Sequence, residues 1–248
     1  MELRDWLWGN AREGRILVIA AHGDDEVLGA GGALADAVRA GIGVKVVILS
    51  VASDSRDLDP ETRRRFKDER IVAARAAAAI GGWSLDLHDF PDNRFCTVPR
   101  IELVKVIERT VAETSPTMVM THFPGDLSRD HQITSAATRT AVRPDGLNLP
   151  ADLVFFEVQS STEWCEQTVG NPFCPTLWYP LTDAAWQAKI RALACYESEL
   201  RRWPHPRSRE GVDVLARYRG SQIGVPLAEA FMLARGVASL AGAGSCSD

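Results

Sequence analysis

Blocks of apolar residues recur along the chain, and their lengths predict buried strands separated by helices. Residues 15–21 (RILVIAA) form a continuous apolar run of strand length, as expected for a strand that is covered on both faces. Four further segments predict strands, namely 44–52, 85–90, 117–123 and 153–158.

Helical patterns fill the intervals between these strands. Pro60 opens a long Arg- and Ala-rich segment that runs to Ile80 and ends at the glycine pair 81–82. Two more helices are expected, over about 26–40 and from about Asp130. An amphipathic pattern also begins at Pro99, with Ile101, Val104, Ile107 and Val111 on one side.

This alternation predicts βαβ units, and hence an α/β fold with a Rossmann-like, mostly parallel sheet and helices on both faces. Beyond about residue 160 the pattern changes to Trp- and Pro-rich loops, a helix near 183–202, a turn (WPHPRS) and a last helix around 226–236. We interpret residues 1–248 as a single domain. Its core spans about 15–160, a small C-terminal lobe packed on the core spans about 161–238, and the tail 239–248 is frayed.

Composition narrows the class of protein. The formal net charge of −5 argues against nucleic-acid partners, because no basic excess is available to neutralise phosphates. The segment MELRDWLWGNAREG does not have the pattern of a signal peptide, and no stretch approaches a membrane span of about 20 apolar residues. The five cysteines are scattered and unpaired in pattern, which is typical of a reducing compartment. We therefore expect a cytoplasmic protein without nucleic-acid or membrane partners, and whether it forms homo-oligomers stays open.

Polar residues gather after two of the predicted strands. The loop after residue 21 carries His22, Asp24, Asp25 and Glu26, and the loop after residue 121 carries His122, Asp126, Asp130 and His131. In the commonest doubly wound order, the first three strands step outward and the fourth returns to the other side of the first. Ligands bind at that reversal, outside the carboxyl ends of the strands. The topology therefore predicts that these two loops face each other.

Histidine and carboxylate together are the ligands of a zinc-type site, and a catalytic zinc typically takes three side chains and leaves one position open. His22 and Asp25 have a spacing that lets both reach one ion across a tight turn, and His131 is a candidate third ligand. Asp24 would then be free to act as a base toward a water molecule. The alternative is structural, because acids in a first helical turn stabilise the helix dipole and an Asp–His pair is often a cap beside a surface histidine.

Glycines at 29, 31 and 32 raise the further alternative of a phosphate-binding loop. They lie inside the predicted helix, however, and the turn before it holds three acids that would repel a pyrophosphate.

The segment AAHGDDEVLGAGG (20–32) resembles the signature of the PIG-L/LmbE-like zinc N-deacetylases, and GDLSRDH (125–131) is similar to a second element of that family. The resemblance runs from about residue 15 to 235 and implies that His22, Asp25 and His131 bind zinc and that Asp24 is the general base. Glu26 would bond backbone amides of the turn.

Three positions depart from the family pattern. Gly23 stands where proline is usual, and Cys96 stands where an aspartate is expected. Ser128 stands where some members have a histidine that assists the leaving amine, and His205 and His122 are the candidates for that role. We assign it to His205 in the predicted catalytic set.

The resemblance implies a zinc-dependent hydrolase, with Fe²⁺ as an alternative metal, that removes an N-acetyl or other N-acyl group from an amino sugar or its conjugate. Arg56, Asp92 and Arg94 follow the second and third strands and are candidate substrate-binding residues, although surface ion pairing would also account for them. Two other functions stay open, namely an amidase acting on a non-sugar N-acyl metabolite and a non-catalytic sugar-binding relative.

Overall fold

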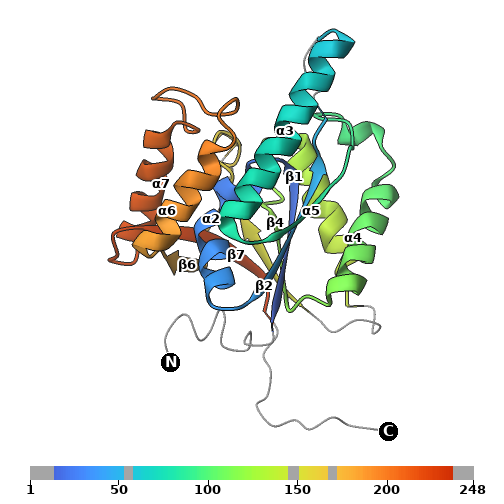
Figure 1. Cartoon of the computed structure of the whole chain (residues 1–248). Coiled ribbons are helices and arrows are strands. Elements are labelled where there is room, and N and C mark those ends of the chain that lie inside the picture. The colour runs from blue at the N-terminus through green and yellow to red at the C-terminus, as the bar shows by residue number, and fades with distance from the viewer. Residues whose placement is uncertain (1–13, 53–57, 145–150, 167–171, 237–248) are drawn as a thin grey trace, which may run out of the picture.

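The structure, a computed structural model, describes residues 14–52, 58–144, 151–166 and 172–236. Arg56 and the tail 239–248, two subjects of the sequence predictions, lie outside these ranges. The described strands form one sheet of seven in the order β3-β2-β1-β4-β5-β7-β6 (Figure 1). No helix in the described ranges is long and apolar enough to cross a membrane.

Five strands are parallel and form the predicted core of the sheet. They are β1 (Arg15–His22), β2 (Gly43–Ser50), β3 (Ser84–Leu87), β4 (Met118–His122) and β5 (Asp152–Phe156). The order steps outward from β1 to β3 and returns to β4 on the other side of β1. The predicted α/β fold with its reversal at β1 and β4 is therefore confirmed.

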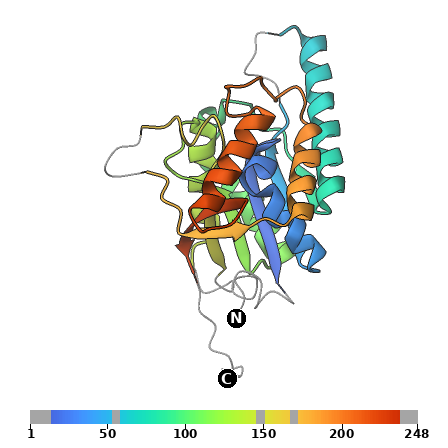
Figure 2. The same cartoon turned by 90° about the vertical axis from the view of Figure 1, so that its left-hand side faces the viewer.

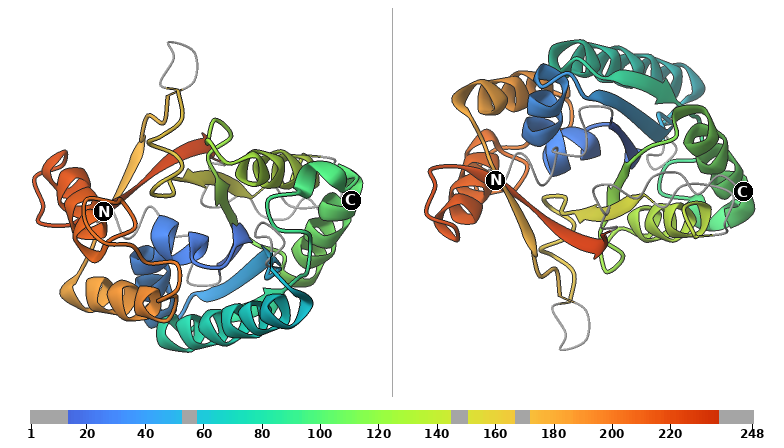
Figure 3. Two further views of the ribbon diagram at one scale, coloured as in Figure 1. Left: turned by 90° about the horizontal axis from the view of Figure 1, so that it is seen from above. Right: turned by 90° about the horizontal axis from the view of Figure 1, so that it is seen from below.

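Helices cover both faces because alternate residues of each strand point to opposite sides. The helices are α2 (Asp25–Arg39), α3 (Pro60–Gly81), α4 (Arg100–Thr114), α5 (Arg129–Ala141), α6 (Asp183–Ala194) and α7 (Arg209–Ser221), with a short 3-10 turn η2 (Phe95–Thr97). Ile16 and Val18 of β1 pack in the core under α2, α3 and α6, whereas Leu17 and Ile19 pack under α4 and α5. Figure 3 shows the two helical layers on either side of the sheet.

The C-terminal segment differs from its prediction. Residues 228–235 form strand β7 (Ala228–Arg235) and not the helix expected around 226–236. This strand pairs antiparallel with β5 and with a further strand, β6 (Leu177–Pro180). The helix of this region is α7, and the helix expected over 183–202 ends at Ala194. The segment thus extends the central sheet, and α7 lies beside β7 (Figure 2).

A buried ion pair ties this extension to α2. Lys189 of α6 donates to the carboxylate of Glu229 at 2.6 Å and to the Leu28 carbonyl at 2.7 Å. Glu229 in turn accepts hydrogen bonds from the backbone N–H groups of Gly32 and Ala33. The middle of α2 is therefore held by side chains of α6 and β7.

Candidate functional site

The turn between β1 and α2 places two aspartates in different environments. Asp24 has φ 94°, in the left-handed region, and its side chain makes no capping hydrogen bond to α2. Its N–H donates to the Glu26 carboxylate at 3.1 Å, and Tyr196 donates to the same carboxylate at 2.7 Å. Non-glycine residues in this region cost of order 1–3 kcal/mol and cluster at functional sites. The structure thus does not support helix capping as the role of the Asp24 side chain.

His22, Asp25 and His131 meet at the reversal of the strand order. Asp25 Oδ2 lies 3.3 Å from His131 Nε2 and 3.5 Å from His22 Nδ1, and it accepts the His22 N–H at 2.9 Å. One ligand atom from each of the three residues can be chosen so that all lie within 4.8 Å of one another. The structure therefore brings together the three residues predicted to be ligands.

The donor set fits a divalent cation. Asp25 Oδ1 is buried and has no hydrogen-bond partner in the described ranges, although a buried carboxylate oxygen normally has one. Burial opposes protonation of His22, but hydrogen bonds to Asp130 and Asp25 raise its pKa to about 10. Burial likewise opposes protonation of His131, yet Asp25 and Asp126 raise its pKa to about 9. These carboxylates create a strongly negative potential that favours a bound cation.

Outer carboxylates orient both histidine rings. His131 Nδ1 lies 3.1 Å from Asp126 Oδ1, and Asp126 also accepts from Ser161 and Thr162. His22 Nε2 lies 3.1 Å from Asp130 Oδ2. Partners of this kind fix the ring orientation and tautomer of metal-binding histidines, so Nε2 of His131 and Nδ1 of His22 are left facing Asp25.

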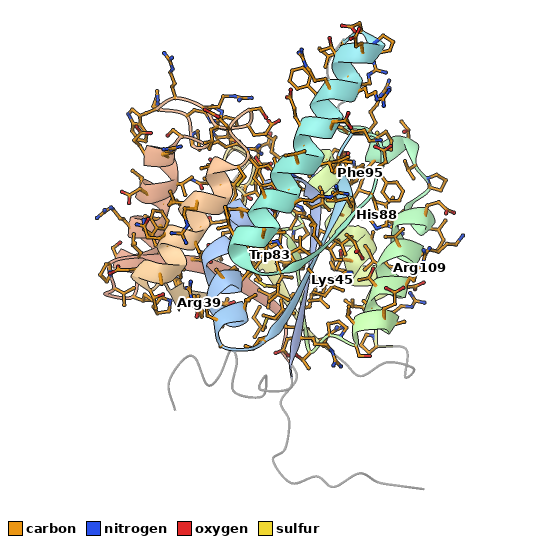
Figure 4. All side chains as sticks on the ribbon, in the orientation of Figure 1. Arg39, Lys45, Trp83, His88, Phe95 and Arg109 are labelled. Carbon is orange, nitrogen blue, oxygen red and sulfur yellow. The ribbon has the colours of Figure 1, made fainter. Side chains whose placement is uncertain are left out.

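Phe95 of η2 packs near His22 and contacts Asp130. Its N–H donates to the second oxygen of Asp130 at 3.0 Å, and its ring centroid lies 5.9 Å from that of His22. Figure 4 shows Phe95 toward the edge of the sheet where the parallel strands end. The site therefore depends on a segment about 70 residues distant in sequence from His22.

A cavity of about 300 Å³ opens beside the three candidate ligands. Polar side chains make up most of its wall. It is lined by His22, Gly23, Asp24, Ser50, Arg70, Asp92, Asn93, Leu127, Ser128, His131, Ser160, Ser161, Glu199 and Arg207. Burial raises the pKa of Asp24 to about 7, against the opposing effect of the Arg207 charge.

The other predicted site residues are placed differently. Asp92 lines the cavity and accepts from Arg70 at 3.1 Å. Arg94 is exposed and does not line it. His205 also lies outside the lining, with its Nδ1 accepting the Arg207 N–H and its ring against Trp164.

His122 and Ser128, which the sequence analysis also named, make contacts that support the fold around the site. His122 is fully buried and stacks on His131 at 4.0 Å, and burial beside His131 lowers its pKa to about 3. Ser128 caps α5 through the His131 N–H. The sequence reasoning assigned no role to Arg70, Glu199 or Arg207, although all three line the cavity. Arg207 belongs to the turn WPHPRS noted in the sequence, whereas no local motif marks Arg70 or Glu199.

The mostly parallel sheet, with a histidine–carboxylate group at its strand reversal, makes this an α/β protein with a candidate metal site. Residues 17–142, which are 126 of the 248, match the family model PIG-L, described as GlcNAc-PI de-N-acetylase. The chain therefore belongs to this family, as the motif at residues 20–32 led us to expect.

Solved structures share the fold over nearly the whole chain. The 4-carboxy-2-hydroxymuconate hydratase GalB from Pseudomonas putida KT2440 is 24% identical with a TM-score of 0.74, and the match covers 92% of this chain and 100% of that one. The A40926 pseudoaglycone deacetylase Dbv21 is 23% identical with a TM-score of 0.71, covering 89% and 96%.

The N,N'-diacetylchitobiose deacetylase from Pyrococcus horikoshii is 18% identical with a TM-score of 0.71, covering 93% of this chain and 89% of that one. No curated protein matches the sequence significantly. The fold is thus common to deacetylases and to a hydratase, so the reaction has to be argued from the site.

Proposed function

We propose that this protein is a metal-dependent N-deacetylase that releases acetate and a free amine from an N-acetylated amino sugar or amino-sugar conjugate. The observation that carries the proposal is the group of His22, Asp25 and His131, of which the last two are buried. It includes the unpartnered Asp25 oxygen and lies beside Asp24 in the cavity. Membership of the GlcNAc-PI de-N-acetylase family supports the reaction type.

His22, Asp25 and His131 would hold the metal, which we propose is Zn²⁺, with Fe²⁺ as the alternative in the cell. When bound, such a metal lowers the pKa of a coordinated water toward about 7 and polarises the acyl carbonyl. The histidine nitrogens are already oriented by Asp126 and Asp130, so the protein holds the ligand set in place through these partners.

Asp24 is the group that accepts the proton of the attacking water. It lines the cavity next to the ligand set, and a base with a pKa near the working pH transfers protons most effectively. The protonated Asp24 can then return this proton to the departing amine. His205, which the sequence reasoning favoured for that step, would have to move to reach the cavity.

The polar wall of the cavity suits the hydroxyl groups of a sugar. Asp92 and Glu199 offer acceptors, and Asn93 and Ser160 offer amide and hydroxyl groups. A volume of about 300 Å³ lies at the lower end for small-molecule sites and admits a compact substrate part. Among the described cysteines none forms a disulfide, which supports our proposal that the protein acts in the cytoplasm.

The test is acetate release by the metal-loaded protein from N-acetylated amino sugars, their glycosides and nucleotides, with non-sugar N-acyl compounds as a second set. Asp24→Asn serves as the matched control. The proposal predicts acetate from at least one sugar compound, and release at least about 10²-fold slower with the variant.

Because the hydratase GalB shares the fold, unsaturated carboxylates form a third set, followed by loss of their ultraviolet absorbance. Absorbance loss without acetate release in any set would replace the proposal with a hydratase function. Acetate release from the non-sugar N-acyl compounds alone would show that the substrate is not an amino sugar.

A further inference from the structure

Arg207, in the segment between α6 and α7, reaches the proposed base. Its Nη1 lies 3.0 Å from Asp24 Oδ2, and the exposed fractions of the two side chains are 21% and 3%. No hydrogen bond from the described ranges reaches the other carboxylate oxygen, Oδ1, of Asp24. One oxygen is therefore anchored by a charged partner, and the other is left for chemistry in the cavity.

The guanidinium of Arg207 is itself held on more than one side. Its Nε donates to the carbonyl of Gln159 at 3.2 Å, and the Gln159 amide donates to the Pro206 carbonyl at 3.0 Å. A Cβ at Gly211 would lie 2.4 Å from the Pro206 carbonyl oxygen, so α7 packs closely on the segment before Arg207. Two different nitrogens of one planar group thus bind two fixed acceptors, which a lysine ammonium reproduces poorly.

The turn that carries Asp24 needs such an anchor. Asp24 has a left-handed backbone and no capping contact, so packing of α2 alone does not fix its carboxylate. Arg207 supplies a fixed contact at Asp24 Oδ2 from outside the turn, at 3.0 Å.

We propose that Arg207 is a positioning residue that holds the Asp24 carboxylate in its reactive placement. The inference rests on the proposed function, because Asp24 is the base of that reaction. It predicts that substitution of Arg207 lowers kcat only when Asp24 is present to be positioned.

The experiment uses the metal-loaded full chain and the sugar compound that the wild type hydrolyses fastest. Arg207→Ala should lower kcat by roughly 10²-fold, while KM changes by less than about 3-fold and metal affinity is retained. Arg207→Lys should recover only part of the loss. In the Asp24→Asn background the Arg207→Ala change should cost less than about 3-fold, because residues that act as a unit are non-additive.

Chemical rescue separates positioning from general stabilisation. The space left by Arg207→Ala opens to the cavity, so guanidinium at about 50 mM should raise kcat of this variant at least about tenfold, whereas urea, its neutral isostere, should not. The matched control is Arg219→Ala, because Arg219 of α7 pairs with Glu157 at 2.7 Å but does not line the cavity. Guanidinium should leave the kcat of that control unchanged.

The outcomes are distinguishable. An active wild type with a nearly unchanged Arg207→Ala kcat, an additive double variant, equal rescue by urea, or a loss explained by metal release would each overturn the role of Arg207 and leave the proposed function intact. A wild type that releases no acetate from any compound would overturn the proposed function and this inference together.

Discussion

Asp24 and Asp25 are neighbours in the chain, and their unequal environments predict unequal consequences of the same substitution. Asparagine is the informative replacement because it matches aspartate in shape and tolerates the left-handed backbone that Asp24 adopts at φ 94°. Asp24→Asn therefore keeps the turn and removes the negative charge, and with it both the proton acceptor and the ion pair with Arg207. A substitution to alanine would confound this loss with backbone strain.

The expected magnitudes follow from the two roles. A positioned general base contributes about 10²–10⁴-fold, so Asp24→Asn should raise the barrier by about 3–5 kcal/mol at 1.36 kcal/mol per decade. Metal content should stay close to that of the wild type. Asp25→Asn removes the carboxylate that faces both histidine ligands. Loss of a residue that only orients a ligand typically weakens metal binding by about 10–100-fold, so the loss in this variant should be larger.

Acetate release at saturating substrate and elemental analysis after gel filtration measure the two quantities on the same preparations. The division of roles would be refuted if Asp24→Asn kept more than about a tenth of wild-type kcat. It would equally be refuted if the two variants retained the same amount of metal.

Three further predictions concern the support of the site. Asp126→Ala should weaken metal binding by about 10–100-fold in a chelator competition, and unchanged affinity would show that the carboxylate does not orient its histidine. Lys189→Met should lower the free energy of unfolding, measured in urea, by about 3–5 kcal/mol, because it leaves the buried Glu229 carboxylate without its charged partner. Lys45→Met, which breaks a surface pair with Asp86, should lower it by less than about 1 kcal/mol. Equal losses would contradict the buried pair. Gly29→Ala should destabilise by about 1–3 kcal/mol, since its Cβ would meet the Phe156 ring at 2.4 Å; a gain, usual inside helices, would contradict this packing.

The parallel core was predictable because its strands are short apolar runs with helical patterns between them. The reversal of strand order then placed residues 22–25 opposite residues 122–131 without any knowledge of contacts. The segment 226–236 was predicted wrongly for a physical reason. The Ala, Leu, Glu and Met residues of this segment favour helix. Pairing with β5 and β6 and burial of the first four residues of β7 outweigh that propensity.

The residues of the candidate site likewise fall into those that the sequence could predict and those that it could not. The three predicted ligands come from two loops whose motifs are local, and these loops do meet. Arg70, Glu199 and Arg207 come from α3 and from the segment between α6 and α7, and only tertiary packing brings them to the cavity. The sequence reasoning chose His205 because an imidazole can transfer protons. In the structure it is Arg207, two residues later in the chain, whose side chain reaches Asp24.

Metal titration of the metal-free protein tests the central claim most directly. Acetate release from the best substrate should rise in proportion to added Zn²⁺ or Fe²⁺, reach its plateau at about one ion per chain, and be absent at every ion concentration in His131→Ala, which loses one of three ligands. Full acetate release by the chelated protein, or a stoichiometric metal retained by His131→Ala, would contradict the account.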